Sequence, residues 1–371
     1  MSTLKDKNIE KNKMFNDKFQ SFISKKATMT CMYPGCRKNA VNSHSISKKS
    51  SLYRIAEDGK LITSKSKRND AERNKKIKFE NIVINIASTF KGFCNDHESI
   101  FFDIDQREIC TYRDIFCQIY RTTCKEIFIN DAIKKTERDV QGFEILYNSK
   151  FEKSKLINSE NVMHLFHDLL IDYPEAYQKI PLNKNFMAAF EPYTDASDLK
   201  IKVIIKKLNF KCPVAVQTKL TVNKGKLQYD CFVIVVPNDN STIIIIISHP
   251  DELQCLLGHV GSDIDSLCFI ESVMMLDGDW YIKPSIVQSW SPEKLKAIED
   301  DYYFFTERKF IDSYDISIFD QIRQSLCKSL SNERRVAELK KINNFPNRKC
   351  FAKRESIQNE KMINDIYQKH K

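Results

Sequence analysis

The sequence predicts an α+β protein, in which a small module rich in Cys and His precedes a helical connector and a mostly antiparallel sheet with helices. Three observations support this fold class. Cys and His pairs lie at short spacings within the first hundred residues, a helical apolar period follows, and short β-branched segments dominate residues 201–248. A chain of 371 residues is long enough for two or three domains.

The first 110 residues are predicted to hold an N-terminal helix or arm and the Cys/His module. Residues 1–26 form the arm, since Phe15, Phe19 and Phe22 recur at helical spacing. Residues 27–110 form the module. Within it, residues 64–80 are highly charged and show no apolar period, which predicts a loop or a solvated helix.

Residues 111–180 are predicted to be helical, because apolar side chains recur with a helical period over 111–133 and again near 160–171. Residues 181–320 should form an α+β domain. Its predicted strands are 201–206, 212–219, 229–236 and 242–248, and the turn residues 237–241 join the last two in a hairpin. Their nearly continuous apolar character indicates burial on both faces.

The last part of the chain contains one strong helix-start signal and then becomes basic. Ser291 is a predicted N-cap, with Pro292 at the first helical position and Glu293 in the first turn. Residues 321–371 are predicted to be a basic C-terminal tail.

Charge is distributed unevenly along the chain, whose net charge is +10. Residues 1–80 carry 20 Lys and Arg against 8 Asp and Glu, and residues 321–371 carry 13 against 5, so the middle of the chain is acidic. Basic ends around an acidic body favour contact with a polyanion, and nucleic acid is therefore the predicted partner. A protein partner is the second option.

No secretory signal is visible at the N-terminus, and the longest aliphatic run, Ile243 to Ile247, is too short to cross a bilayer. We therefore expect a cytoplasmic protein with no membrane partner. In a reducing compartment, closely spaced Cys residues are more often metal ligands than disulfides.

Two Cys and His pairs have the spacing of zinc knuckles. Cys31 and Cys36 end a tight turn that contains Pro34 and Gly35, and Cys94 and His97 lie three residues apart. Together they form a Cys₃His set, which is typical of structural Zn²⁺. Residues 27–100 contain few large apolar side chains, so a bound metal would help this segment to fold.

This arrangement resembles the treble-clef zinc fold and, within that group, the HNH-type (ββα-metal) nucleases. The resemblance covers about residues 28–105 and includes the segment from Asn42 to Ile46, which follows the first knuckle. It implies that His44 is a general base for water attacking a phosphodiester. Where HNH domains carry a second functional histidine, this chain has Glu98. Glu98 or Asp96 could then ligate a catalytic Mg²⁺ or Mn²⁺ ion, and the middle Asn of the HNH pattern could be Asn81, Asn85 or Asn95.

Three interpretations of His44 remain open on the sequence: a catalytic base, an alternative zinc ligand, or a structural or nucleic-acid-contacting residue. The leading hypothesis is a zinc-stabilised, metal-dependent nuclease or nuclease-derived effector that acts on DNA or RNA. The resemblance also suggests a role in bacterial antiviral defence. The alternative is a non-catalytic zinc-containing adaptor for nucleic acid or protein, which the glutamate at position 98 favours.

Overall fold

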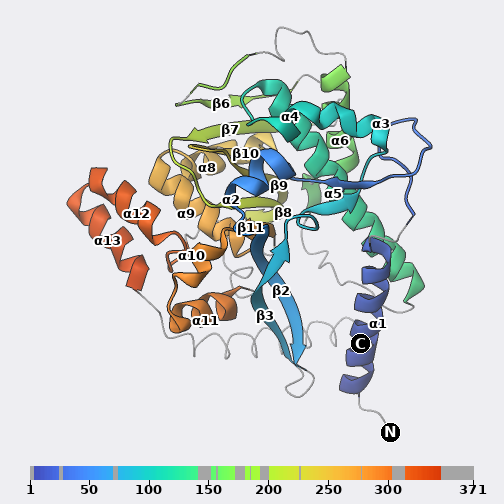
Figure 1. Cartoon of the computed structure of the whole chain (residues 1–371), viewed down its shortest axis with the longest axis horizontal. Coiled ribbons are helices and arrows are strands. Elements are labelled where there is room, and N and C mark those ends of the chain that lie inside the picture. Colours follow the sequence, from blue (N-terminus) through green and yellow to red (C-terminus); the bar gives the residue numbers. More distant parts are fainter. Residues whose placement is uncertain are drawn as a thin grey trace.

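An antiparallel sheet lies at the centre of the computed structural model, with helices on both of its faces (Figure 1). The structure describes residues 4–24, 28–69, 74–140, 152–155, 158–171, 180–183, 185–192, 200–224, 227–276, 278–302 and 314–343. Along the sheet the strand order is β3-β2-β11-β8-β9-β10-β7-β6, and every neighbouring pair in this order is antiparallel. The predicted α+β class is confirmed.

The strands of this sheet are β2 (Lys60–Asn69), β3 (Asn74–Val83), β6 (Met187–Phe190), β7 (Lys202–Leu208), β8 (Val214–Lys224), β9 (Leu227–Pro237), β10 (Thr242–Ser248) and β11 (Asp279–Ile282). A short strand, β5 (Glu152–Lys155), pairs in parallel with β9. The four strands predicted between 201 and 248 are therefore confirmed, as is the hairpin of β9 and β10.

The central strands are buried on both faces, as their sequence predicts. In β10, Ile243, Ile245 and Ile247 belong to one hydrophobic core, and Ile244 and Ile246 belong to a second core on the opposite face. All five are fully buried. This alternation follows from the two-residue period of a strand, and it explains why the run is apolar at every position.

Helices α5 (Tyr112–Asp139) and α6 (Ser159–Ile171) cover one face of the sheet, and both were predicted. Thr111 and Asp114 form a capping box at the start of α5. Cys117 and Cys124 are fully buried along α5. Helix α1 (Leu4–Ile23) forms where the N-terminal arm was expected, and its Lys18 pairs with Asp139 at the end of α5.

The other face is covered by C-terminal helices (Figure 1). They are α8 (Leu253–His259), α9 (Asp263–Met274), α10 (Pro284–Gln288), α11 (Pro292–Asp301) and α12 (Asp320–Leu326), and α13 (Asn332–Asn343) packs on the outside against α12. The predicted N-cap of α11 is confirmed, since the Ser291 side chain accepts a hydrogen bond from the amide of Lys294.

Part of the predicted basic tail belongs to the folded body. Arg323 of α12 is fully buried and forms ion pairs with Glu271 of α9 and Glu338 of α13. Such a buried charge is tolerated because two carboxylates and their hydrogen bonds compensate it. Residues 344–371 lie outside the described residues.

The prediction of a loop or solvated helix over residues 64–80 is wrong, because residues 64–69 belong to β2 and residues 74–80 to β3, and these two long strands pair in antiparallel register; residues 70–73 lie outside the described residues. Ile77 and Phe79 alternate with lysines, and both pack into the core that contains Trp280. In addition, the Phe79 amide donates a hydrogen bond to Glu299 of α11. Two apolar residues are too few to establish a strand period by themselves, so the tertiary contacts decide the structure.

A second, two-stranded sheet lies beside the N-terminal Cys and His residues. It pairs β1 (Asn42–His44) with β4 (Thr89–Lys91) in antiparallel register. The hairpin of β2 and β3 and the short helix α2 (Tyr53–Ile55) lie between these strands in the sequence, and α3 (Asn95–Glu98) and α4 (Phe102–Gln106) follow β4. Among the described residues, no helix is both long and apolar enough to span a membrane.

Candidate functional site

The first knuckle brings Cys31 and Cys36 together through a tight turn. The Cys36 amide donates a hydrogen bond to the carbonyl of Tyr33, and the Cys31 amide donates to the carbonyl of Lys38. Gly35 has φ +77°, a left-handed conformation that glycine adopts without steric cost. The sequence pattern Pro-Gly between the two cysteines therefore produces the expected reversal.

The second knuckle is the start of α3. Cys94 is the N-cap residue in an extended conformation, and the His97 amide donates to the Cys94 carbonyl. The Cys94 amide also donates to the Cys31 sulfur at 3.2 Å, which ties the two knuckles together. The fully buried Phe93 anchors this segment in the core beneath α5.

The four predicted ligands converge, and their ligand atoms all lie within 4.8 Å of one another. The Nδ1 atom of His97 is 3.4 Å from the Cys31 sulfur and 3.3 Å from the Cys94 sulfur, and the sulfurs of Cys36 and Cys94 are 4.0 Å apart. A tetrahedral zinc ion with bonds of about 2.3 Å to sulfur and about 2.0 Å to nitrogen requires separations of roughly 3.5–3.8 Å. These residues could therefore hold a metal ion, and the donor set is consistent with structural zinc.

Aromatic contacts orient the imidazole of His97. Tyr33 stacks on it with ring centroids 3.8 Å apart and an interplanar angle of 7°. His167 of α6 meets the edge of the same Tyr33 ring. Burial raises the pKa of the Cys31 thiol to about 11, although the backbone amides of Tyr33 and Cys94 oppose this shift. A metal cation would supply the positive charge that a thiolate needs at this position.

His44 lies at the end of β1, outside the group of four converging ligands. Its Nδ1 atom is 2.9 Å from the carbonyl oxygen of Ala87, so the ring donates its Nδ1 proton there. Burial lowers the pKa of His44 to about 4, the Ala87 carbonyl opposes this shift, and the charges of Arg121 and Lys48 reinforce it. His44 is therefore neutral near pH 7, with Nε2 as the unprotonated nitrogen.

A strained segment presents the carbonyl that His44 contacts. Ser88 has φ +57°, which is unfavourable for a residue with a side chain. Several bonds compensate for it: the Ser88 amide donates to the Tyr281 hydroxyl at 2.7 Å, and the Ser88 carbonyl accepts from both the amide and the hydroxyl of Ser45. The turn before β4 is thus fixed to the central sheet through Tyr281 of β11.

An ion-pair cluster lies beside His44. Arg121 of α5 is fully buried and forms two hydrogen bonds with Asp105, at 2.8 and 2.9 Å, and a longer contact of 3.4 Å with Glu98. Burial raises the pKa of Glu98, and Arg121 only partly opposes this. For Asp105, burial acts in the same direction, but the bonds from Arg121 outweigh it and the pKa is lowered.

The structure brings some of the candidate catalytic residues close together and leaves others apart. The charge of Arg121 acts to lower the pKa of both His44 and Glu98, so these two residues lie near the same guanidinium. Asp96, in contrast, is exposed and forms an ion pair with Lys38. The three candidate asparagines, Asn81, Asn85 and Asn95, are all exposed.

Sequence reasoning missed Arg121 and Asp105. A signal existed for Arg121, because a charged residue next to Ile119 and Tyr120 on the buried side of an amphipathic helix requires a partner.

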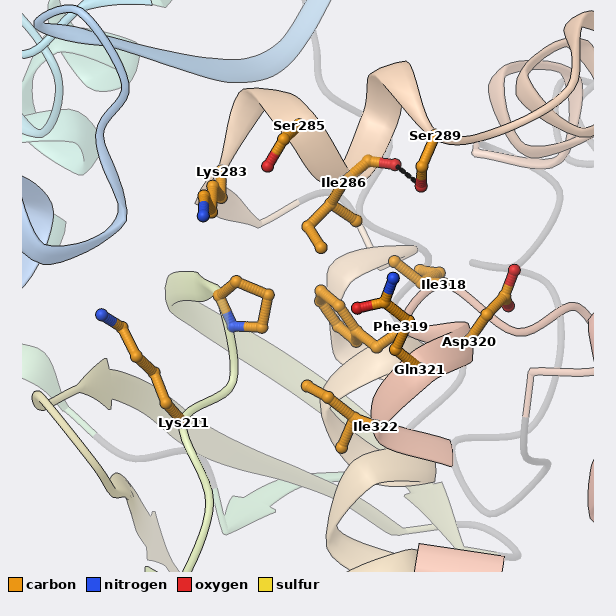
Figure 2. Close-up of a pocket in the computed structure, with 11 residues that line it drawn as sticks. Lys211, Lys283, Ser285, Ile286, Ser289, Ile318, Phe319, Asp320, Gln321 and Ile322 are labelled. Carbon is orange, nitrogen blue, oxygen red and sulfur yellow. Dashed lines mark hydrogen bonds between the residues drawn. The ribbon is translucent and has the colours of Figure 1, made fainter. Parts of the chain in front are cut away.

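A separate pocket of about 380 Å³ lies between the start of β8, helix α10 and helix α12 (Figure 2). Lys211 and Lys283 lie on one side of it, and Phe319 and Ile322 form part of its apolar wall. Lys283 is paired with Glu57 at 3.2 Å. None of the predicted site residues lines this pocket.

Comparison of the chain with protein-family models, curated proteins and solved structures finds no match to any of them. The function of the chain must therefore be inferred from the geometry of its own residues.

Proposed function

We propose that this chain is a zinc-stabilised, metal-dependent endonuclease of the HNH type, acting on DNA or RNA, with His44 as its general base. The hydrogen bond from His44 Nδ1 to the Ala87 carbonyl carries the proposal. This bond fixes the tautomer and leaves Nε2 unprotonated to accept a proton from an attacking water. The acceptor is a backbone carbonyl held in a strained turn. Because a carbonyl does not titrate, it can accept this hydrogen bond at any pH. The burial that lowers the pKa of His44 weakens it as a base, and the negative charge of a bound phosphate would raise this pKa toward neutrality.

The order of elements supports this proposal. A knuckle and the strand β1 precede the strand β4, a second knuckle and helix α3, which is the order expected of a treble-clef module with the hairpin of β2 and β3 inserted between its two strands. His44 stands on the first of the two strands, where the HNH resemblance places the base. The uneven charge of the chain supports a polyanionic substrate.

Arg121 favours a second function, that of a non-catalytic zinc-containing binding protein. A catalytic Mg²⁺ ion prefers carboxylate oxygens. The carboxylate of Asp105 acts electrostatically on His44, and Glu98 shares with it the ion pair to Arg121. Both face the buried guanidinium of Arg121, which already supplies a positive charge at that position. Because Arg121 is fully buried and paired with both carboxylates, its role in either function is to hold Asp105 and Glu98 in place.

A cleavage assay with His44→Ala tests the first function. Supercoiled DNA, duplex RNA and single strands should be incubated with the full chain and Mg²⁺ or Mn²⁺. Loss of a general base typically reduces the rate by about 10²–10⁴, and zinc content should be unchanged. The exposed His164 of α6 provides a matched control, since His164→Ala should cleave at the wild-type rate. Full activity in His44→Ala would refute the catalytic assignment, and an inactive wild type that still binds nucleic acid would support the second function.

A further inference from the structure

The hairpin of β2 and β3 is an extended ribbon that leaves the central sheet (Figure 1). The only register pair between β2 and its other neighbour β11 is Ile62 with Ile282, among the described residues. Beyond Ile62, β2 continues for seven residues in register with β3. At about 3.3 Å per residue this stretch is roughly 23 Å long.

Like charges are paired directly across this ribbon. Lys65 is opposite Lys78, Lys67 is opposite Lys76, and Arg68 is opposite Lys75. Positively charged residues thus occupy facing register positions on both strands of the ribbon, and a polyanion lying along the ribbon would neutralise their charge.

The charge of the segment agrees with this interpretation. Residues 60–80 contain eight of the 20 Lys and Arg that lie in the first 80 residues, against three Asp and Glu. At the described base of the ribbon, the side chains of Lys65 and Lys78 are 44% and 49% exposed, although each contacts one carboxylate. The base itself is held firmly, because Ile62, Ile77 and Phe79 pack into the core beside Trp280.

The ribbon is connected directly to the proposed site. Strand β3 ends at Val83, and the next five residues lead to β4 and include Ala87, whose carbonyl contacts His44. Leu61 of β2, Ile84 and Ala87 share a small core with Ile46, which follows β1 closely. The base of the ribbon and the residue whose carbonyl orients His44 are therefore held in one small core.

We propose that the hairpin of β2 and β3 is a DNA-binding arm that contacts the backbone of duplex DNA. This inference rests on the proposed function for the class of partner. A two-stranded ribbon fits the major groove of B-form DNA, whereas the major groove of duplex RNA is too narrow to admit it. The lysines and arginines of the arm contact phosphates, so binding depends on charge and not on base sequence.

The test compares two full-length variants that each remove four positive charges. The arm variant is Lys67→Thr, Arg68→Thr, Lys75→Thr and Lys76→Thr, since threonine favours strands. The control changes four exposed residues on helices or turns remote from the arm, Lys134, Arg138, Lys328 and Lys340, to glutamine. Affinity for a labelled 30-base-pair duplex is measured over a series of salt concentrations, together with the melting temperature.

The arm variant should bind at least about tenfold more weakly near 0.1 M salt, and the log–log salt slope should fall by about 0.9 for each phosphate interaction that the substitutions remove. Its melting temperature should stay close to that of wild type, because Ile62, Ile77 and Phe79, which hold the base of the arm in the core, are unchanged. The control should retain most of its affinity. An unchanged slope in the arm variant, or an equal loss of affinity in the control, would overturn the proposal.

Further measurements separate the partner and the proposed function. Duplex RNA or vesicles of anionic lipid bound as tightly as duplex DNA would contradict the assignment to DNA. His44→Ala should bind duplex DNA as wild type does while losing cleavage. Arm-dependent binding without any cleavage by the wild type would leave the arm established and refute the nuclease function alone.

Discussion

Arg121 and Asp105 form a bidentate ion pair inside the protein, with the guanidinium fully buried over the ring of Phe101 at 4.2 Å. The pair joins helix α5, which covers the central sheet, to helix α4, which follows the candidate zinc site. Because Glu98 contacts the same guanidinium, one cation holds two acidic residues of the N-terminal module against the main body.

Replacing this cation should be costly. Arg121→Met leaves the partly buried Asp105 and Glu98 without their partner, and breaking a buried ion pair typically costs about 3–5 kcal/mol. We expect a loss of this size in urea unfolding. Arg138→Met, on the exposed side of the same helix, should change stability by less than about 0.5 kcal/mol. Equal effects of the two substitutions would show that the buried pair contributes nothing specific.

Elemental analysis should find one zinc ion per chain, as the converging Cys₃His set implies. Cys94→Ala should lose the metal and make residues 28–106 sensitive to protease, because their folding is coupled to metal binding. Cys110→Ala is the control, since Cys110 lies outside the ligand group. A metal-free protein with a protease-resistant N-terminal region would contradict this prediction.

His44 should make stability depend on pH in a defined direction. Its pKa is about 4 in the folded protein, chiefly because of burial, and near 6.5 in an unfolded chain. Between these values the unfolded state binds more protons, so stability rises with pH over that range and is lost as the pH falls through it. Urea unfolding at pH 4.5 and pH 7 should show a smaller difference for His44→Gln than for wild type. The same difference in both proteins would mean that His44 is already protonated in the folded state.

Two glycines should respond in opposite ways to the same substitution. A Cβ atom on Gly92 would lie 2.7 Å from the Phe90 ring and 2.9 Å from the Ser43 hydroxyl, so Gly92→Ala should cost about 1–3 kcal/mol. Gly258 lies in helix α8 with no atom within 4 Å of that position. Gly258→Ala should therefore stabilise the protein by about 0.5–1 kcal/mol. Thermal unfolding of both variants provides the check, and a neutral Gly92→Ala would mean that Phe90 moves freely.

Local patterns predicted the parts of this fold that local physics determines. The run from Ile243 to Ile247 indicated burial on both faces because a strand alternates its side chains, and Ser291 indicated a helix start because its hydroxyl caps Lys294. The converging Cys and His residues were predictable as well, since the short spacing within each pair constrains the backbone. The strand conformation in residues 64–80 was not predictable. Phe79 lies in a strand because it contacts Trp280 and Glu299, which are more than 200 positions away in the sequence.

The candidate site was predictable to a similar extent. The residues carrying the knuckles and His44 follow one another in a recognisable order, and the structure brings them to one region. The partners of His44 were not visible in the sequence, because Ala87 contributes only a backbone carbonyl and Asp105 pairs with Arg121 across 16 residues. Every residue has a backbone carbonyl, so the residue type at position 87 gives no sign that its carbonyl contacts a histidine. The HNH assignment itself stays a prediction until cleavage is measured.

The long interval between the knuckles has a consequence for how the chain folds. Cys36 and Cys94 are separated by 57 residues, and this interval contains the whole of β2 and β3. A metal ion bound by both knuckles closes a loop of that length, and a cross-link of this size removes about 4 kcal/mol of chain entropy from the unfolded state in the loop-closure model. The unfolded chain would first bind the ion through the local pair Cys31 and Cys36. Cys94 and His97 would complete the metal site only after the ribbon has docked on the sheet. The rate of formation of the complete four-ligand site would therefore equal the rate of that long-range folding step.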